Sequence, residues 1–512
     1  MDRLARQQRY GAGALIAAVS LLAGVMLATL ADGEDTVAVG TADSATGGTL
    51  GVGTGSADGA TTDGPLTQDG ATVDGGTVTG DSSGTATGTP TGAASSGATS
   101  DGATATASGN SGASARGVTG TSVKIGVAYL DLSALGQFPQ FRIVPGDKAV
   151  AAIKAGLKKR GEIPVHGRDV ELKLVPYNVL NAEDQRAACQ RLVKDEKVFA
   201  VVGHTVFEAG AECVAKDEKT PIVMPDPVPN AAIQAGAPFY FSLSMSTETM
   251  ARNLVHYARS KNLLAGKKLG IYFGDDNGPT TVLARETKAE LGKLGFSVAA
   301  EQSTPMPSRA VGANPQPGPD DHLAVQRFQQ AGVQVAFLFG THGRFSQAAQ
   351  QQGYKPQYLN NDMNVGASDT TASAYQPDQY DGAFAITGTR RNEAKLGRLS
   401  PKAQQCLDDY AAGSGDRIDV IRRESEWGAL AILCDVVYTA VEGLKQTGGN
   451  LTHATYVQGL ERIRGLQLAM QGITTFAPGR HAGGDGYRSL VWRKATGYQI
   501  EAPSDFRPLF VP

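Results

Sequence analysis

The stretch FAVVGHTVFEAGAEC, residues 199–213, joins two hydrophobic patterns within one short segment. Its first part is a continuous apolar run, which is typical of a buried strand, and this run stops at Gly203-His204-Thr205. Apolar residues then recur at helical spacing through Cys213. A buried strand followed at once by a helix is the repeating unit of an α/β fold with a parallel sheet.

The same alternation extends to both sides of this stretch. In the first half, strands are predicted at residues 122–130, 170–178, 198–204, 221–226 and 239–246, with helices between them. A second set repeats the pattern, with strands at 268–276, 296–302, 333–342 and 381–389. The sequence therefore predicts two doubly wound α/β lobes.

The C-terminal part holds too few elements for a third domain and is expected to complete the two lobes. It contains a long helix through Trp427 and Val436, a helix at 452–463 and a strand at 487–494. We therefore expect one folded region at 118–512. Lobe 1 takes about 118–246, lobe 2 takes about 247–389, and each takes part of 390–512.

Residues 1–31 carry an export or anchoring signal. Arg3, Arg6 and Arg9 precede an uncharged apolar run at residues 11–30. At about 1.5 Å per residue this run matches the roughly 30 Å hydrocarbon core of a bilayer. Either an uncleaved transmembrane anchor or a secretory signal cleaved after Ala31 fits the sequence. Both place the rest of the chain outside the cytoplasm, tethered to the membrane if the segment is retained.

Residues 32–117 consist almost entirely of Gly, Ala, Thr, Ser and Asp and contain no aromatic residue. Such a segment cannot offset its conformational entropy by burying apolar surface, so we predict a disordered linker. The segment contains several carboxylates and a single basic residue, Arg116. A Gly-rich coil of this length has a root-mean-square span of roughly 50 Å. The linker suits a tether, although a solvated tail without a specific role is the alternative.

The four cysteines allow three disulfide pairings, which an exported protein can form. We favour Cys189 with Cys213 and Cys406 with Cys434, because each pair lies on successive predicted helices that could face one another. Four buried free thiols are the alternative.

Several function classes lack their sequence signals. The near-neutral charge and dispersed basic residues argue against nucleic acid as a partner. The only G-x-S-x-G, at residues 80–84, lies in Gly/Ser coil rather than between a strand and a helix. The seven histidines are scattered without metal-ligand spacing, and the chain has no P-loop motif. We therefore expect neither a metal nor a cofactor.

The crevice beyond the carboxyl ends of parallel strands is the natural binding place in such folds. Gly203 would let a ligand approach the backbone, and Thr205 with Glu208 matches a capping box for the next helix. The hydroxyl and free amide at that helix start could instead hold a ligand carboxylate. Asp226 ends the next strand beside the same crevice, although Asp before Pro is also a common turn former.

The order of several short segments resembles that of the type I solute-binding proteins of the leucine/isoleucine/valine-binding kind, which serve ABC importers. The likeness spans about Val123 to Glu501 and rests on VVGHT, PIVMPD, IYFGDDNG, LNND and TTFAPGRHAGGDGYRSLVWR. It implies two Rossmann-like lobes joined by three crossover strands, a small solute bound between them, and no catalysis.

The resemblance also implies a set of ligand-binding residues. Those from lobe 1 are Gly203, His204, Thr205, Phe207 and Asp226, and those from lobe 2 are Asp276, Asn277, Gly278, Thr341, His342 and Asp362. A turn or cap role is the commoner role for each lobe 2 residue, and a histidine at a strand end, such as His204, is usually a hydrogen-bonded turn residue. Val206 and Phe207 stand where the family has hydroxyls, and Pro225-Asp226-Pro227 replaces a small Thr-containing turn, so an ordinary branched-chain amino acid is not the expected ligand.

The sequence therefore predicts a monomeric, exported solute receptor that delivers a small polar molecule, such as an amino acid or amide, to an ABC permease. The alternatives are a ligand-sensing module that docks on another membrane protein without transport and, third, an exported enzyme.

Overall fold

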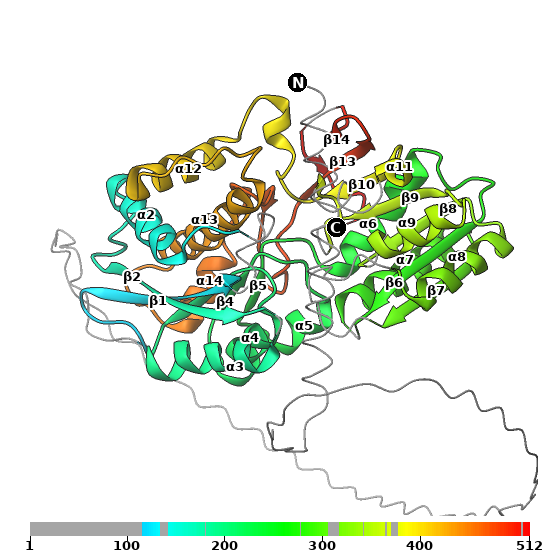
Figure 1. Cartoon of the computed structure of the whole chain (residues 1–512). Helices are drawn as coiled ribbons and strands as arrows, with labels where there is room; N and C mark the ends of the chain where they lie inside the picture. The colour runs from blue at the N-terminus through cyan, green and yellow to red at the C-terminus, as the bar shows by residue number, and fades with distance from the viewer. Residues whose placement is uncertain are drawn as a thin grey trace, which may run out of the picture. The chain divides into compact units, whose positions relative to one another are not determined.

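The computed structural model describes residues 115–133, 142–179, 181–276, 278–305, 317–340, 342–363, 366–369, 377–502 and 505–511. The described residues form two main sheets, each covered by helices (Figure 1). We call the five-stranded sheet with its helices lobe 1, and the eight-stranded sheet with its helices lobe 2. The predicted α/β architecture with two doubly wound lobes is confirmed.

The sheet of lobe 1 is entirely parallel, with strand order β2-β1-β3-β4-β5. Its strands are β1 (Ser122–Asp131), β2 (Asp169–Asn178), β3 (Ala200–Gly203), β4 (Ile222–Met224) and β5 (Tyr240–Ser242). The intervening helices are α2 (Gly146–Lys159), α3 (Ala182–Gln190), α4 (Glu208–Glu212) and α5 (Asn230–Ala235), and the π-helical turns η3 (Arg191–Asp195) and η4 (Cys213–Asp217) extend α3 and α4.

Alternation along β1 gives lobe 1 a core on each face of its sheet. Ile125 and Val127 belong to the core under α2 and α13 (Glu424–Lys445), whereas Ala128 and Leu130 belong to the core under α3 and α4. Figure 1 shows α2 and α13 on one side of the sheet and α3 and α4 on the other. Because both faces are covered, the central strands β3 and β4 are apolar throughout, which is why they were recognisable in the sequence.

The sheet of lobe 2 has the order β14-β13-β10-β9-β8-β6-β7, with β15 paired to β13. Its parallel strands are β6 (Leu269–Asp275), β7 (Val298–Pro305), β8 (Val335–Phe339), β9 (Gln357–Asn361) and β10 (Phe384–Thr387). The late strands β13 (Gly486–Arg493), β14 (Gly497–Ile500) and β15 (Arg507–Pro508) pair antiparallel. The helices of this part are α6 (Thr247–Ser260), α7 (Pro279–Lys293), α8 (Pro319–Ala331), α9 (His342–Gln351), α11 (Pro377–Tyr380) and the 3-10 turn η6 (Glu393–Leu396).

The remaining C-terminal helices belong to lobe 1. These are α12 (Pro401–Ser414), α13 and α14 (His453–Leu460), and their apolar residues join the same core as α2. Two short strands, β11 (Leu466–Gln467) and β12 (Ile473–Thr474), follow and pair with each other. Of the helices described, α13 alone is long and apolar enough to span a bilayer, but 89% of its apolar window is buried in the fold, as expected of a core helix.

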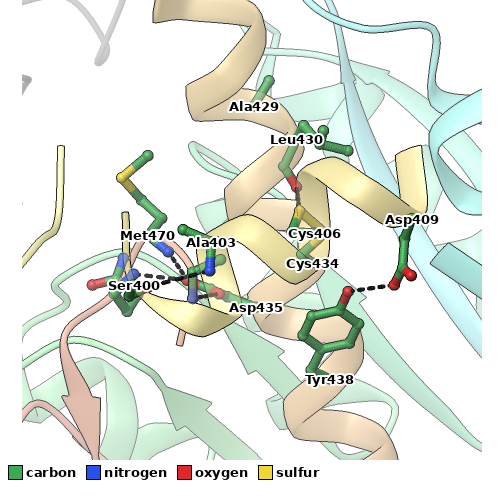
Figure 2. The surroundings of a disulfide bond; sticks show 12 residues. Ser400, Ala403, Cys406, Asp409, Ala429, Leu430, Cys434, Asp435, Tyr438 and Met470 are labelled. Atoms are coloured by element: carbon green, nitrogen blue, oxygen red, sulfur yellow. Dashed lines mark hydrogen bonds between the residues drawn. A yellow bond between two sulfur atoms is a disulfide. The ribbon is translucent and has the colours of Figure 1, made fainter. Parts of the chain in front are cut away.

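Both predicted disulfides are present. Cys189 of α3 pairs with Cys213 of η4, and Cys406 of α12 pairs with Cys434 of α13. Figure 2 shows the second bond between α12 and α13, next to Asp435. The two bonds use all four cysteines, so the alternative of free thiols is wrong.

A short crossover segment, residues 469–472, contacts both lobes. The backbone N–H of Arg390 donates to the Met470 carbonyl at 2.7 Å, and Gly472 N–H donates to the Gly388 carbonyl at 3.0 Å, both in lobe 2. In lobe 1, the Gln471 side chain donates to the Pro225 carbonyl at 3.1 Å. The segment therefore couples the end of β10 to the end of β4.

The folded region begins earlier than the sequence predicted. Arg116, placed in the linker, donates through Nε to the Val198 carbonyl at 3.1 Å and through Nη2 to Thr220 Oγ1 at 2.5 Å. The predicted boundary between Gly117 and Val118 would separate these contacts from lobe 1, so the boundary was placed too late. The predicted signal or anchor and residues 32–114 of the predicted linker lie outside the described residues.

Candidate functional site

The carboxyl ends of the parallel strands bring Thr205 and Asp226 together in lobe 1. Thr205 follows β3 and donates its hydroxyl to Asp226 Oδ1 at 2.7 Å, while the Val206 N–H donates to Asp226 Oδ2 at 2.7 Å. Asp226 follows β4, and burial raises the pKa of its carboxyl above the usual range. Both residues are partly exposed to solvent.

This contact corrects the prediction that Thr205 caps the next helix. The helix α4 begins at Glu208, its N-cap position is Phe207, and no side chain caps it there. Val206 adopts a φ of 61°, which is unfavourable for a β-branched residue, and this turn separates Thr205 from the helix. The Thr205 hydroxyl therefore serves Asp226 rather than the backbone of α4.

The other three residues predicted for lobe 1 are buried in the fold. A Cβ at Gly203 would collide with the Met224 sulfur, so glycine is needed there for packing. The His204 Nε2–H donates to the Ala429 carbonyl of α13 at 3.0 Å, and burial lowers the pKa of His204 to about 4. Phe207 is fully buried against the Tyr177 ring, with a centroid distance of 4.6 Å. These three residues are buried in the packing behind the strand ends.

Lobe 2 presents Asp362 in a setting similar to that of Asp226. Asp362 follows β9, and its Oδ2 accepts hydrogen bonds from Thr387 Oγ1 at 2.7 Å and Gly388 N–H at 2.6 Å. Burial raises the pKa of Asp362 to about 6, with the nearby Arg391 charge opposing the shift. The residue is partly exposed, as is Thr389 beside it.

The first strand end of lobe 2 has a structural role. Asp276 Oδ1 accepts from the Gly278 N–H at 2.8 Å, and Asp276 Oδ2 accepts from the Thr280 N–H at 3.2 Å, so this carboxylate caps the start of α7. Gly278 is the N-cap residue of that helix. The predicted contacts Asn277 and Thr341 lie outside the described residues, and His342 opens α9.

The sequence did not point to three residues that contact the turns carrying Asp226 and Asp362. Thr387 and Gly388 hold Asp362, and Ser244 donates to the Pro225 carbonyl at 2.7 Å next to Asp226. All three lie at or just beyond strand ends, which is the signal that could have found them. Their contacts hold the turns that carry Asp226 and Asp362.

A separate cavity of about 860 Å³ lies at the end of β1, lined by residues that include Tyr129, Asp131, Arg142, Leu174 and Arg423. Its lining does not include Thr205, Asp226 or Asp362. Within the described ranges no three His, Cys, Asp or Glu side chains gather as they would around a metal ion.

Comparison with known proteins places this fold in a family. A family model described as periplasmic binding protein matches residues 122–495. A leucine-binding protein from Thermotoga maritima has 16% sequence identity and a TM-score of 0.55, over 74% of this chain and 98% of that one. A solute-binding protein of an ABC transporter from Rhodopseudomonas palustris, solved with 3,4-dihydroxybenzoic acid, has 18% identity and a TM-score of 0.54, over 76% and 97%.

A third structure, an ABC transporter substrate-binding protein from Desulfitobacterium hafniense in complex with Leu, has 16% identity and a TM-score of 0.51, over 76% of this chain and 100% of that one. A search among curated proteins gives no significant match. At these identities the solved structures establish the fold, whereas the family model covers most of the chain. The protein therefore belongs to the periplasmic binding protein family.

Proposed function

We propose that the protein is the extracytoplasmic substrate-binding component of an ABC importer and holds a small polar solute between its lobes. The family match over residues 122–495 carries the proposal. Partly exposed polar groups at the carboxyl ends of both sheets support it: Thr205 and Asp226 in lobe 1, and Asp362 with Thr389 in lobe 2.

A solute that touches both lobes explains why each lobe places a carboxylate at its strand ends. Such a ligand gains its full set of contacts only when the lobes approach one another, so binding favours a closed form. The crossover segment 469–472 links the ends of β4 and β10 and is the place where such a movement would pivot. The solved relatives carry Leu in one case and 3,4-dihydroxybenzoic acid in another, which are both small polar molecules.

The rest of the chain fits a receptor outside the cytoplasmic membrane. Residues 1–31 would direct export or anchor the protein, and the predicted linker would let the folded region reach a permease. The two disulfides suit an oxidising compartment. No catalytic role is proposed, because the site offers acceptors and donors for binding and the family binds solutes.

A thermal-shift screen with amino acids, amides, short peptides and aromatic acids tests the proposal. A solute at 100 times its dissociation constant adds about 2.7 kcal/mol to stability. Asp362→Ala should abolish the shift, whereas Asp378→Ala, an exposed carboxylate on α11 of the same lobe, should keep it. Mass spectrometry should recover the solute unchanged. Chemical conversion of the solute, or no stabilising compound in the whole set, would contradict the proposal.

A further inference from the structure

The donors at the strand ends of lobe 1 are already engaged by the protein itself. The Thr205 hydroxyl and the Val206 N–H point at the two oxygens of Asp226, at 2.7 Å each. Ser242 Oγ donates to the Asp226 carbonyl at 2.7 Å, and Tyr177 Oη donates to the Thr205 carbonyl at 2.5 Å, so both backbone segments are fixed. A ligand carboxylate arriving here would find its two nearest donors occupied by another carboxylate.

What the site offers to a ligand is therefore hydrogen-bond acceptors with negative charge. An ionised carboxylate has about four lone-pair positions, and these two contacts use only part of them. Among the described residues, no Lys, Arg or His side chain forms an ion pair with Asp226 at 4.0 Å or less. An anion placed next to Asp226 would be repelled without compensation, whereas an ammonium group would complete its hydrogen bonding.

Asp362 repeats this arrangement on the other lobe. Asp362 is also a partly exposed residue, and it accepts from the Thr387 hydroxyl and from the backbone amides of Gly388 and Thr389. A solute between the lobes would thus meet a carboxylate on each side. A carboxylate held by a hydroxyl and backbone amide contacts occurs in both lobes. We therefore infer that the binding site offers hydrogen-bond acceptors from lobe 1 and from lobe 2.

We propose that Asp226 determines the ligand class, so that the site takes a molecule presenting an ammonium or similar cationic nitrogen donor to lobe 1 and rejects one presenting a carboxylate there. The proposal rests on the solute-binding function proposed above. It assigns Asp226 a direct contact with the ligand, in addition to its role in holding the strained Val206 turn.

Matched pairs of an amine and a carboxylate test whether the site prefers an ammonium group. The full-length protein, in mild detergent, is titrated calorimetrically with isopentylamine against 4-methylpentanoate and with tyramine against 3-(4-hydroxyphenyl)propionate, and with leucine and tyrosine, which carry both groups. The wild type should bind each amine at least about tenfold more tightly than its carboxylate partner. Asp226→Asn should weaken amine binding by roughly 10- to 100-fold, since a charge-assisted hydrogen bond is lost.

A matched variant controls for the loss of a charge. Asp217→Asn removes an equal charge from an exposed position at the end of η4 and should leave the affinities unchanged.

Carboxylate binding as tight as amine binding in the wild type would overturn the proposal while leaving the solute-binding function intact. Unchanged amine affinity in a folded Asp226→Asn variant would reduce Asp226 to a structural residue and would likewise overturn it. If none of these probes, including the two amino acids, binds the wild type, the result counts against the amine class and against the solute-binding function together.

Discussion

Asp435 is the residue whose removal should disturb the connection between the lobes most. It lies on α13, is fully buried, and accepts three consecutive backbone N–H groups from the crossover segment: Ala469 at 2.5 Å, Met470 at 2.9 Å and Gln471 at 2.7 Å. Figure 2 shows the carboxylate facing this segment beside the Cys406–Cys434 bond. One side chain thus fixes the backbone that joins the ends of β4 and β10.

Replacing Asp435 by Ala would leave three buried N–H groups without their acceptor. An unsatisfied buried donor costs about 1–3 kcal/mol, and part of this is offset because the variant no longer buries a carboxyl group. We expect a net loss of about 3 kcal/mol in the free energy of unfolding, a large share of the 5–15 kcal/mol typical of a folded protein. Urea unfolding at pH 7 measures this, with the exposed Asp408→Ala of α12 as the control.

The pH dependence of this loss follows from the carboxyl group. Burial raises the pKa of Asp435 to about 7, with the three backbone N–H bonds opposing the shift. The pKa in the unfolded chain is about 3.9, so between about pH 4 and pH 7 the folded state holds a proton that the unfolded state has lost. The contribution of Asp435 to stability is thus fully present below about pH 4 and is lost as the pH rises to about 7.

The difference in unfolding free energy between wild type and Asp435→Ala should accordingly be larger at pH 5 than at pH 8. A difference that grows with pH would refute the assignment, because it would mean that the three N–H bonds outweigh burial and hold the group ionised. A loss below about 1 kcal/mol at both pH values would show that the crossover segment does not depend on Asp435.

Three further perturbations have defined outcomes. Removing the Cys406–Cys434 bond by a double Ser substitution should cost about 3–4 kcal/mol in the chain-entropy model, for a sequence separation of 28, and thiol titration of denatured, unreduced wild type should find no free thiol. Gly156→Ala in α2 should destabilise the protein by about 1–3 kcal/mol, because the new methyl group collides with the Asp409 carboxylate of α12. Gly292→Ala in α7 should stabilise it by about 0.5–1 kcal/mol, because the new methyl group contacts no other atom there. Because the pKa of Asp362 is about 6, affinity for an ammonium ligand should rise between pH 5 and 7, with proton release seen by calorimetry in buffers of different ionisation heat.

Local patterns were sufficient to predict the fold. Continuous apolar runs such as 199–202 mark strands covered on both faces, and helical spacing with Asn181 as a cap marks the helices between them. The disulfides followed, because successive helices on one face of a parallel sheet lie side by side. The antiparallel end of lobe 2 depends on the pairing of β10 with β13, about 100 residues apart in sequence, and this pairing appears only in the structure.

The site was predicted less well because its contacts are long-range. The capping motif at Thr205 is a four-residue signal, but its hydroxyl is taken by Asp226, which lies 21 residues further along the chain. The sequence pattern also gave no indication of the side on which a strand-end residue lies, so His204 and Phe207 could not be separated from Thr205. Asp226 and Asp362 were selected correctly as strand-end residues, and their role in ligand binding stays a prediction.

Hydrogen exchange on the full-length protein, with and without a solute found by the screen, tests the central claim most directly. A solute held between the lobes should slow exchange at the strand ends of both, in peptides covering 203–207 and 225–227 and in those covering 361–363 and 387–389. The crossover segment 469–472 should also be protected as the lobes close. Protection confined to one lobe, or centred on the cavity at the end of β1, would contradict a site shared by the two lobes.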